Sequence, residues 1–177
     1  PNAPAPEPID TAPRDRSLVF WGRLDFEPNV DAACWFAKQV WPELRFRFPD
    51  ATLELIGKQP TAAVKQLGEL PGVTVTGPVD DLRPHAQRAS AVVLPLRVGA
   101  GIKNKLLEAA AMGMPIIASP RAVRGLDMGE GRKPVVVAKT INQWTESVRR
   151  VWTDELHRRD LGGQARAWVE RNHNWAS

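Results

Sequence analysis

The sequence is poor in cysteine and in long apolar runs. Cys34 is the single cysteine among 177 residues, so an internal disulfide is excluded. No apolar run approaches the roughly 20 residues that a membrane-spanning helix needs, and the leading residues 1–16 lack the apolar core of a signal peptide. We therefore expect a cytoplasmic protein, with any membrane association confined to the cytoplasmic face.

Metal-ligating patterns are also missing. The three histidines, His85, His157 and His173, have no metal-ligand spacing with one another and no cysteine partners, so we assign no metal site. The first apolar run is followed by GRLDFEPN and lacks G-x-G-x-x-G, which disfavours an NAD-dependent dehydrogenase. Cys34 falls within an amphipathic helical pattern, and we expect a buried, unreactive thiol.

The composition is that of a basic globular protein. Hydrophobic residues make up 43% and charged residues 25%, and the length fits one domain with a sizeable core. The net charge of +4 suits an anionic ligand, an anionic membrane surface or nucleic acid, and does not choose among them. Arginines in the last helical segments suggest a basic peripheral surface, but interleaved acidic residues favour a solvated helical face. The arginines are Arg149, Arg150, Arg158, Arg159, Arg166 and Arg171, and the acidic residues are Glu146, Asp154, Glu155, Asp160 and Glu170.

Short apolar runs alternate with helical patterns along most of the chain. Residues 1–16 are rich in Pro and charge and are expected to form an interdomain linker, and residues 17–177 a domain with C-terminal helices. The expected strands are 18–21, 53–56, 73–76, 91–96, 115–119 and 134–138. The expected helices are 29–47, 60–69, 80–89, 103–113, 140–152 and 155–171. This alternation predicts an α/β fold, a Rossmann-like doubly wound parallel sheet of about six strands with helices on both faces. Ligands should then bind at the loops after residues 21, 57, 77, 96 and 119.

Residues 95–119 are the most informative segment. Gly99 and Gly101 bracket a turn and a helix begins near Ile102, so free amides and the helix dipole favour a phosphate there, with the backbone around Ala100 close to it. Lys103 adds a positive charge in the first turn, where a cation is normally disfavoured and therefore calls for an anionic partner. The alternative is a solvated surface lysine.

Two further candidates are Glu108 and the glycine after the first strand. Glu108 lies in an otherwise apolar helical stretch, and its carboxylate suits a pair of ligand hydroxyls such as those of ribose. The alternative is an i, i+3 pair with Lys105. Gly22 ends a buried strand, as a close ligand approach requires, although it could simply serve the turn.

At these motifs the sequence resembles the group 1 (family 4) retaining glycosyltransferases of the GT-B fold, specifically their C-terminal, nucleotide-sugar-binding domain. The resemblance covers nearly the whole chain. It rests on GRLDFEPNVDAACWFAKQVWPEL, PDATLELIG, VTVTGPVDDL and KNKLLEAAAMGMPIIAS. It implies that Glu108 is the second glutamate of the E-x7-E motif and binds the donor ribose, and that Val79, Asp80 and Leu82 lie near the base. Asp80 and Asp81 are alternatively caps of the following helix.

The sequence departs from the family at two positions. Ala100 stands where the first motif glutamate is expected, and Pro28 where a loop lysine contacts the diphosphate together with Arg23. Arg23 and Lys103 are therefore our candidates for stabilising the leaving diphosphate. Arg23 has a plainer alternative, a surface salt bridge with Asp25 or Glu27.

The resemblance implies transfer of a sugar from a UDP- or GDP-linked donor with retention of configuration, with no metal and no cofactor. The partners expected are this donor, an N-terminal acceptor-binding domain and a peripheral membrane contact of the full protein, but no nucleic acid. The chain alone should bind the donor weakly and transfer nothing. The alternative is a catalytically inactive nucleotide-sugar-binding or regulatory module of the same fold.

Overall fold

Strands and helices alternate along the chain as the sequence predicts. The computed structural model describes residues 15–99, 103–128 and 134–172. The strands are β1 (Ser17–Trp21), β2 (Thr52–Ile56), β3 (Val73–Thr76), β4 (Ala91–Leu94), β5 (Ile116–Ala118) and β6 (Val136–Val137). The helices are α1 (Glu27–Trp35), the π-helical segment η1 (Phe36–Val40), α2 (Trp41–Arg47), α3 (Ala62–Leu67), α4 (Arg83–Arg88), α5 (Lys103–Ala111), α6 (Ile141–Thr153) and α7 (Glu155–Asn172).

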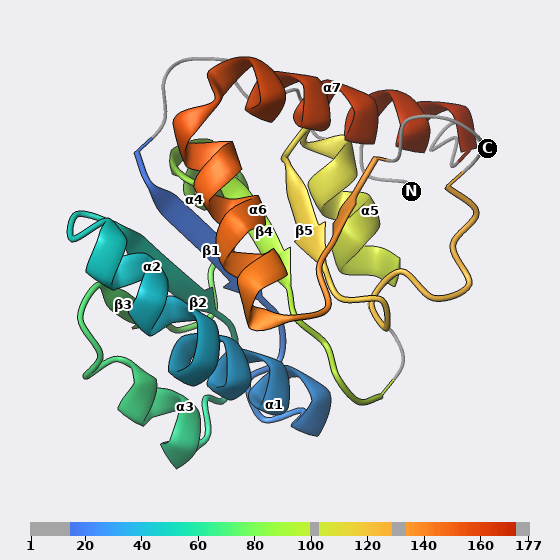
Figure 1. The fold of residues 1–177 in the computed structure, drawn as a ribbon. Helices are drawn as coiled ribbons and strands as arrows, with labels where there is room; N and C mark the ends of the chain where they lie inside the picture. Colours follow the sequence, from blue (N-terminus) through green and yellow to red (C-terminus); the bar gives the residue numbers. More distant parts are fainter. Residues whose placement is uncertain (1–14, 100–102, 129–133, 173–177) are drawn as a thin grey trace.

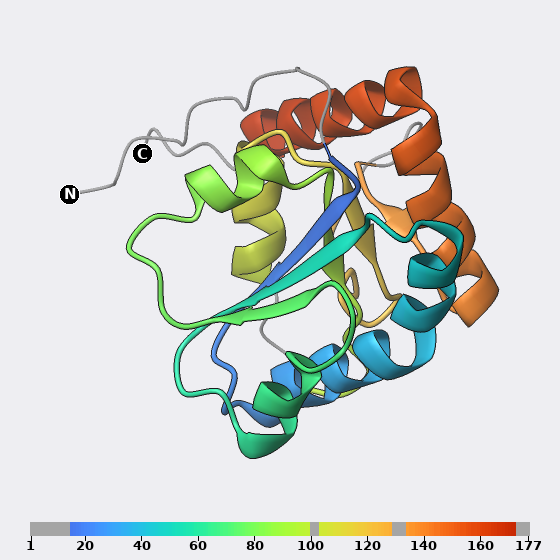
Figure 2. The same cartoon turned by 90° about the vertical axis from the view of Figure 1, so that its left-hand side faces the viewer.

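The six strands form one parallel sheet in the order β3-β2-β1-β4-β5-β6. The helices α1, α2 and α6 cover one face, and α4 and α5 cover the other (Figures 1 and 2). α7 runs along the edge where the strands begin, so their carboxyl ends are left at the opposite edge (Figure 1). The doubly wound, Rossmann-like prediction is confirmed, and the order reverses between β1 and β4, where such folds bind ligands.

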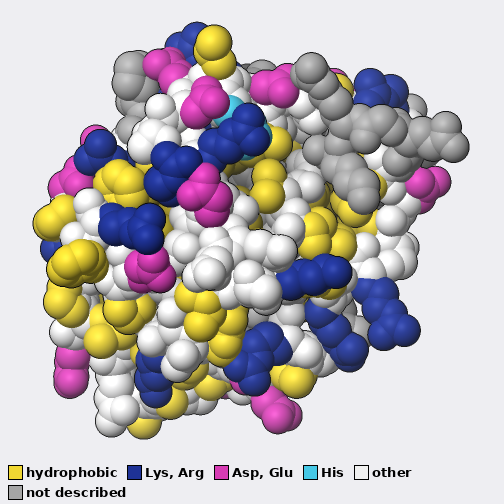
Figure 3. Space-filling view, in the orientation of Figure 1, with side chains coloured by type: hydrophobic (Ala, Val, Ile, Leu, Met, Phe, Trp, Pro, Cys, Tyr) yellow, Lys and Arg dark blue, Asp and Glu magenta, His cyan; other side chains and the backbone are white. Residues whose placement is uncertain are grey.

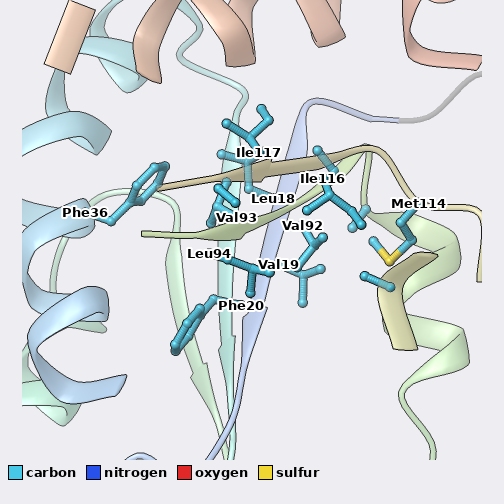
Figure 4. Packing of buried hydrophobic residues seen from close by; sticks show 14 of the residues in the cluster. Leu18, Val19, Phe20, Phe36, Val92, Val93, Leu94, Met114, Ile116 and Ile117 are labelled. Atoms are coloured by element: carbon cyan, nitrogen blue, oxygen red, sulfur yellow. The ribbon is translucent and has the colours of Figure 1, made fainter. Parts of the chain in front are cut away.

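The core lies on both sides of the central strands. All four residues of β4 are buried, as expected for a parallel strand with helices on both faces. Phe36 of η1 and Met114 approach the side chains of β1, β4 and β5 from opposite sides (Figure 4). The ring of Phe36 also packs edge-to-face on Trp144 of α6, with centroids 5.6 Å apart. Aromatic packing therefore holds α6 against η1.

Strands are shorter than predicted where a proline lies within or beside the apolar run. The expected strand 91–96 stops at Leu94, directly before Pro95. The expected strand 134–138 is reduced to Val136–Val137 and follows Pro134. Because proline has no backbone N–H to donate to a neighbouring strand, it limits the hydrogen-bonded part of each apolar run.

The predicted continuous helix 29–47 is three consecutive segments. The backbone N–H of Trp41 donates to the carbonyl of Phe36, five residues earlier, which makes a π-helical turn between α1 and α2. Pro42 follows at the start of α2, where its missing N–H costs least. The periodicity of apolar residues predicts the helical region but not the π-helical turn. We relate that turn to Pro42, because proline has no N–H with which to continue the α-helical hydrogen bonds.

Cys34 differs from the sequence prediction. Its side chain on α1 is half-buried, not buried. Burial still raises the pKa of its thiol, and the charge of Lys38 opposes that effect in part. A raised pKa keeps the thiol protonated at neutral pH, and a protonated thiol is a poor nucleophile. This environment therefore favours the predicted unreactive cysteine, which stays a prediction.

The arginines of α6 and α7 pair with the acidic residues interleaved with them. Arg149 binds Glu146 at 2.6 Å, Arg159 binds Glu155 at 2.7 Å, and Arg166 binds Glu170 at 2.8 Å. These are pairs three or four residues apart on the helix surface. Such pairing is what a solvated helical face shows, and the choice between that face and a basic peripheral surface stays a prediction.

We predict opposite effects for two adjacent glycines of α7. A Cβ at Gly162 would lie 2.3 Å from the carbonyl oxygen of Gly113, which follows α5, whereas a Cβ at Gly163 would meet nothing within 4 Å. Gly162→Ala should lower the free energy of unfolding by about 1–3 kcal/mol through overpacking. Gly163→Ala should raise it by about 0.5–1 kcal/mol through helix propensity. Urea titrations of both variants measure this, and a Gly162→Ala protein as stable as Gly163→Ala would contradict the close packing of α5 and α7.

Candidate functional site

The carboxyl ends of β1 and β4 bring together two of the predicted loops. The loop after β1 contains Gly22 and Arg23, and is tied to the chain after β2 by hydrogen bonds from Gly22 N to Ile56 O and from Leu24 N to Lys58 O. The loop after β4 leads through Gly99 to α5. α5 packs on β5 and α7, and its side chains reach across to the end of β1 and to the first loop.

Gly22 is required by two side chains that lie against it. Lys105 of α5 donates from Nζ to Asn29 Oδ1 at 2.6 Å, and Asn29 donates from Nδ2 to the carbonyl of Arg23 at 2.8 Å. A Cβ at Gly22 would lie 2.5 Å from Lys105 Nζ and 2.8 Å from Asn29 Nδ2. Any larger residue would therefore displace the bridge between α5, α1 and the first loop.

Glu108 is held by the indole of Trp21. The Trp21 Nε1 donates to Glu108 Oε2 at 3.1 Å, which joins the last residue of β1 to the middle of α5. Among the residues that the structure describes, no donor reaches the second oxygen of this half-buried carboxylate. The alternative i, i+3 ion pair is not formed, because Lys105 donates to Asn29. The second oxygen is therefore left to accept a hydrogen bond from a ligand hydroxyl.

The Lys105 ammonium is partly desolvated. Burial lowers its pKa to about 8, and the nearby charge of Glu108 opposes this lowering in part. Its nitrogen also lies 5.3 Å from the centre of the Phe20 ring, a cation–π distance. A lysine with a pKa this far below its ordinary value changes charge close to physiological pH.

Arg23 forms a surface ion pair with Asp25, which is the alternative to a diphosphate contact considered from the sequence. Its guanidinium donates to both oxygens of Asp25, the shorter contact being 2.7 Å, and its side chain is 67% exposed. This hydrogen bond lowers the pKa of the Asp25 carboxyl and raises that of Arg23. The side chain would have to leave Asp25 to reach an anion, so its role in binding stays a prediction.

Pro28 fills the position of the family lysine by packing on Gly99. Gly99 has a φ of 80°, and a Cβ there would lie 2.4 Å from Pro28 Cγ. Glycine at 99 is thus explained by its backbone conformation and by this contact. Ala100, Gly101 and Ile102 lie outside the described residues. α5 begins at Lys103, in agreement with the sequence, and the side chain of Lys103 is likewise outside the described part.

The predicted base-binding residues lie in the segment between β3 and α4. This segment extends from the sheet on the side of α4 and α5 (Figure 2). Asp80 is exposed, whereas Val79 and Leu82 are half-buried against the core. Asp81 precedes the N-cap residue Leu82 and accepts from the backbone N–H of Arg83, the first residue of α4, at 2.9 Å. It therefore satisfies one free amide at the start of α4, which is close to the capping role considered for the two aspartates.

Three residues of this site were not singled out from the sequence. Trp21 was assigned only to a strand, Asn29 only to a helix, and Lys105 only to a pair with Glu108. The usable signal was spacing, because Lys105 and Glu108 are three residues apart and share a helix face. Nothing in the sequence indicated that Asn29 would be the acceptor that Lys105 reaches.

More cations surround the carboxyl edge. Arg121 donates from Nε to the carbonyl of Gly99 at 3.0 Å, and Arg97 lies 3.5 Å from Asp31. Lys and Arg side chains gather at the lower right of Figure 3, beside the ends of β4 and β5. Basic side chains thus lie at the edge that carries the site, as is typical of a site for an anionic ligand.

A cavity of about 320 Å³ lies elsewhere, beside the residues that begin β1 and β2. Its lining includes Arg16, Glu54, His85 and Arg88, and His85 Nδ1 contacts Glu54 Oε1 at 2.9 Å. Arg16 also pairs with Asp50 at 2.9 Å, and the cavity lies at the amino ends of the strands, away from the carboxyl edge. We therefore place the candidate site at Gly22, Lys105 and Glu108, and not in this cavity.

The described residues form neither a metal cluster nor a membrane span. Within residues 15–99, 103–128 and 134–172, no three acidic, histidine or cysteine side chains lie together as metal ligands would. In the same ranges, no helix has both the length and the apolar character that crossing a bilayer demands.

Comparison with solved structures shows where this fold recurs. A point mutant of TarM from S. aureus, in complex with Fondaparinux, alpha-GlcNAc-glycerol and UDP, superposes with a TM-score of 0.75 over 99% of this chain and 35% of that one, at 14% identity. The C-terminal domain of a group 1 family glycosyl transferase (LpcC) from Francisella tularensis superposes with a TM-score of 0.67, covering 90% of this chain and 87% of that one, at 17% identity. The predicted GT-B relationship is confirmed at the level of the fold.

Sequence comparison is more specific. The GDP-mannose-dependent alpha-(1-6)-phosphatidylinositol monomannoside mannosyltransferase of Mycolicibacterium smegmatis is 29% identical over 148 residues, which are 76% of this chain and 39% of that protein. The chain thus spans about two fifths of the length of this relative. The family model described as glycosyl transferases group 1 matches residues 15–154. The chain belongs to the group 1 glycosyl transferases.

Proposed function

We propose that the chain is the donor-binding domain of a glycosyltransferase that moves a sugar from a nucleotide sugar to an acceptor. The observation that carries the proposal is the Glu108 carboxylate, fixed by Trp21 at the point where the strand order reverses. A carboxylate with one oxygen open, beside a glycine loop and a helix start, suits the ribose of a nucleotide whose phosphates lie against that helix.

The reaction needs charge stabilisation more than a protein nucleophile. As the glycosidic bond to phosphate breaks, the departing diphosphate gains negative charge, and fixed cations and amides stabilise that charge in the transition state. We assign this role to Arg23, to Lys103 and to the amides of residues 99–102. Arg23 must exchange Asp25 for the diphosphate, which its exposure allows.

The remaining details rest on relatives. We propose transfer with retention of configuration and without a divalent ion, as the family resemblance implies. The relative's name specifies GDP-mannose and the TarM complex contains UDP, so GDP- and UDP-linked donors are the first to test. Since this chain spans 39% of the relative, we place the acceptor-binding groups on a separate N-terminal domain, across a cleft closed by interdomain motion.

A catalytically inactive binding or regulatory module is the second candidate. It is favoured by the packing of Pro28 on Gly99, which leaves no cation at the position of the family's loop lysine. The two candidates share donor binding and differ only in turnover.

The ribose contact of Glu108 can be tested by calorimetry. UDP or GDP should bind the 177-residue chain and raise its Tm, and Glu108→Ala should weaken binding about 10- to 100-fold through loss of a charged hydrogen bond. The 2′-deoxy nucleotide should bind the unmodified chain more weakly than the ribonucleotide but bind Glu108→Ala equally well. Glu146→Ala, on the surface of α6, is the control and should change nothing. A Glu108→Ala protein that still binds the ribonucleotide more tightly than the 2′-deoxy nucleotide would show that Glu108 does not contact the ribose.

Arg23 and Asp25 give a second, paired test. Arg23→Ala should weaken nucleoside diphosphate binding, because a cation is lost. Asp25→Ala should leave binding unchanged or strengthen it, because the competing carboxylate is removed. Equal weakening in both variants would mean that the ion pair itself positions the loop and that Arg23 does not contact the ligand.

Turnover requires the full-length parent protein. With donor and acceptor it should form product of the same anomeric configuration as the donor sugar, and EDTA should not reduce the rate. Product configuration is read by NMR. Saturable donor binding without any transfer to a panel of acceptors would favour the inactive module.

A further inference from the structure

The ammonium of Lys105 lies against the backbone of Gly22, in the loop after β1. It reaches from α5 across the end of β1, and its nitrogen occupies space that a side chain at position 22 would need. Glycine at 22 therefore leaves the nitrogen next to bare backbone. No other residue type at position 22 would keep this approach open.

The charge of Lys105 is not neutralised within the described structure. An ammonium has three N–H donors, and one goes to the neutral amide of Asn29. No carboxylate among the described residues lies within 4 Å of the nitrogen, and the Glu108 carboxylate, whose charge acts on Lys105 from further away, accepts from Trp21. Buried ammonium groups are normally paired because desolvation is costly. Lys105 is thus built to receive an anion.

We propose, on the basis of the proposed function, that Lys105 is a further cation of the donor site and contacts the diphosphate of the nucleotide sugar. It compensates for Pro28, which removes the lysine expected on the first loop. Asn29 aims the ammonium without cancelling its charge, and the Phe20 ring supports it from β1. The two N–H groups that remain are available to phosphoryl oxygens.

The pH dependence of binding follows from the surroundings of the ammonium. On α5, Glu108 is the charged neighbour whose effect is resolved. β1 contributes the Phe20 ring, α1 the uncharged Asn29, and the first loop the carbonyl of Arg23, whose guanidinium is paired with Asp25. The side chain of Lys103 lies outside the described residues. With a pKa of about 8, Lys105 is charged below that pH and loses its charge above it, so affinity should fall as pH rises.

Calorimetry with UDP and GDP at pH 7 and pH 9 tests the proposal. The terminal phosphate has a second pKa of about 6 and is mostly ionised already at pH 7, so its charge changes little over this range and the titration of Lys105 should weaken binding by about tenfold. Lys105→Met should bind about 10- to 100-fold more weakly at pH 7 and show no such fall. The matching nucleosides, which lack phosphate, should bind Lys105→Met and the unmodified chain alike.

Three variants serve as comparisons. Lys103→Met should keep the fall between pH 7 and pH 9, and Lys65→Met, on the exposed surface of α3, should match the unmodified chain throughout. Lys105→Arg keeps a cation that does not titrate, so it should bind more tightly than the unmodified chain at pH 9, and it remains informative if Lys105→Met does not fold.

Two outcomes would overturn the proposal, and they differ in what else they affect. If the unmodified chain binds the nucleotides but Lys105→Met keeps both the affinity and the pH dependence, Lys105 is structural and the proposed function stands. If the unmodified chain binds neither UDP nor GDP, both proposals fail together.

Discussion

The contact of α5 with the end of β1 is the constraint from which the candidate site follows. It consists of two hydrogen bonds one helical turn apart, Trp21 to Glu108 and Lys105 to Asn29. The first fixes a carboxylate, and the second connects α5 to α1 and, through Asn29, to the loop after β1. Because both originate on one helix, the positions of the carboxylate and the ammonium are coupled. The glycine at 22 makes the second contact sterically possible.

The fold could be predicted because its signals are local. β3 has the bounds that its alternating VTVT run predicted, and α5 starts where the glycine pattern ends. The prolines explain most of the differences: Pro95 and Pro134 shorten strands, and Pro42 lies at the π-helical turn. Those differences were physically accessible from the sequence, since the missing N–H belongs to proline wherever it stands.

The site was predictable only in part because its contacts join distant segments. Glu108 stood out as a charge within an apolar helix, but its partner is 87 residues away. Asn29 and Lys105 are separated by 76 residues, and no periodicity pairs them. Arg23 and Asp81, by contrast, have partners two residues away, and in both cases the contact observed is close to the local alternative considered from the sequence. Sequence reasoning thus located short-range contacts and left the long-range ones to the structure.

The π-helical turn has a consequence for how the first helical segment tolerates change in length. Each residue of an α-helix rotates the following residues by about 100°, since a turn takes 3.6 residues. The π-helical turn of η1 is wider and takes up one additional residue without this rotation, so α2 still presents Trp41 and Leu44 to the core and Pro42 to solvent. A one-residue deletion in η1 would convert it to an ordinary α-helical turn and leave the orientation of α2 nearly unchanged, whereas a one-residue deletion within the regular turns of α1 would rotate α2 by about 100°. The π-helical turn is therefore the part of this helical region where the loss of one residue should disturb the packing of α2 least.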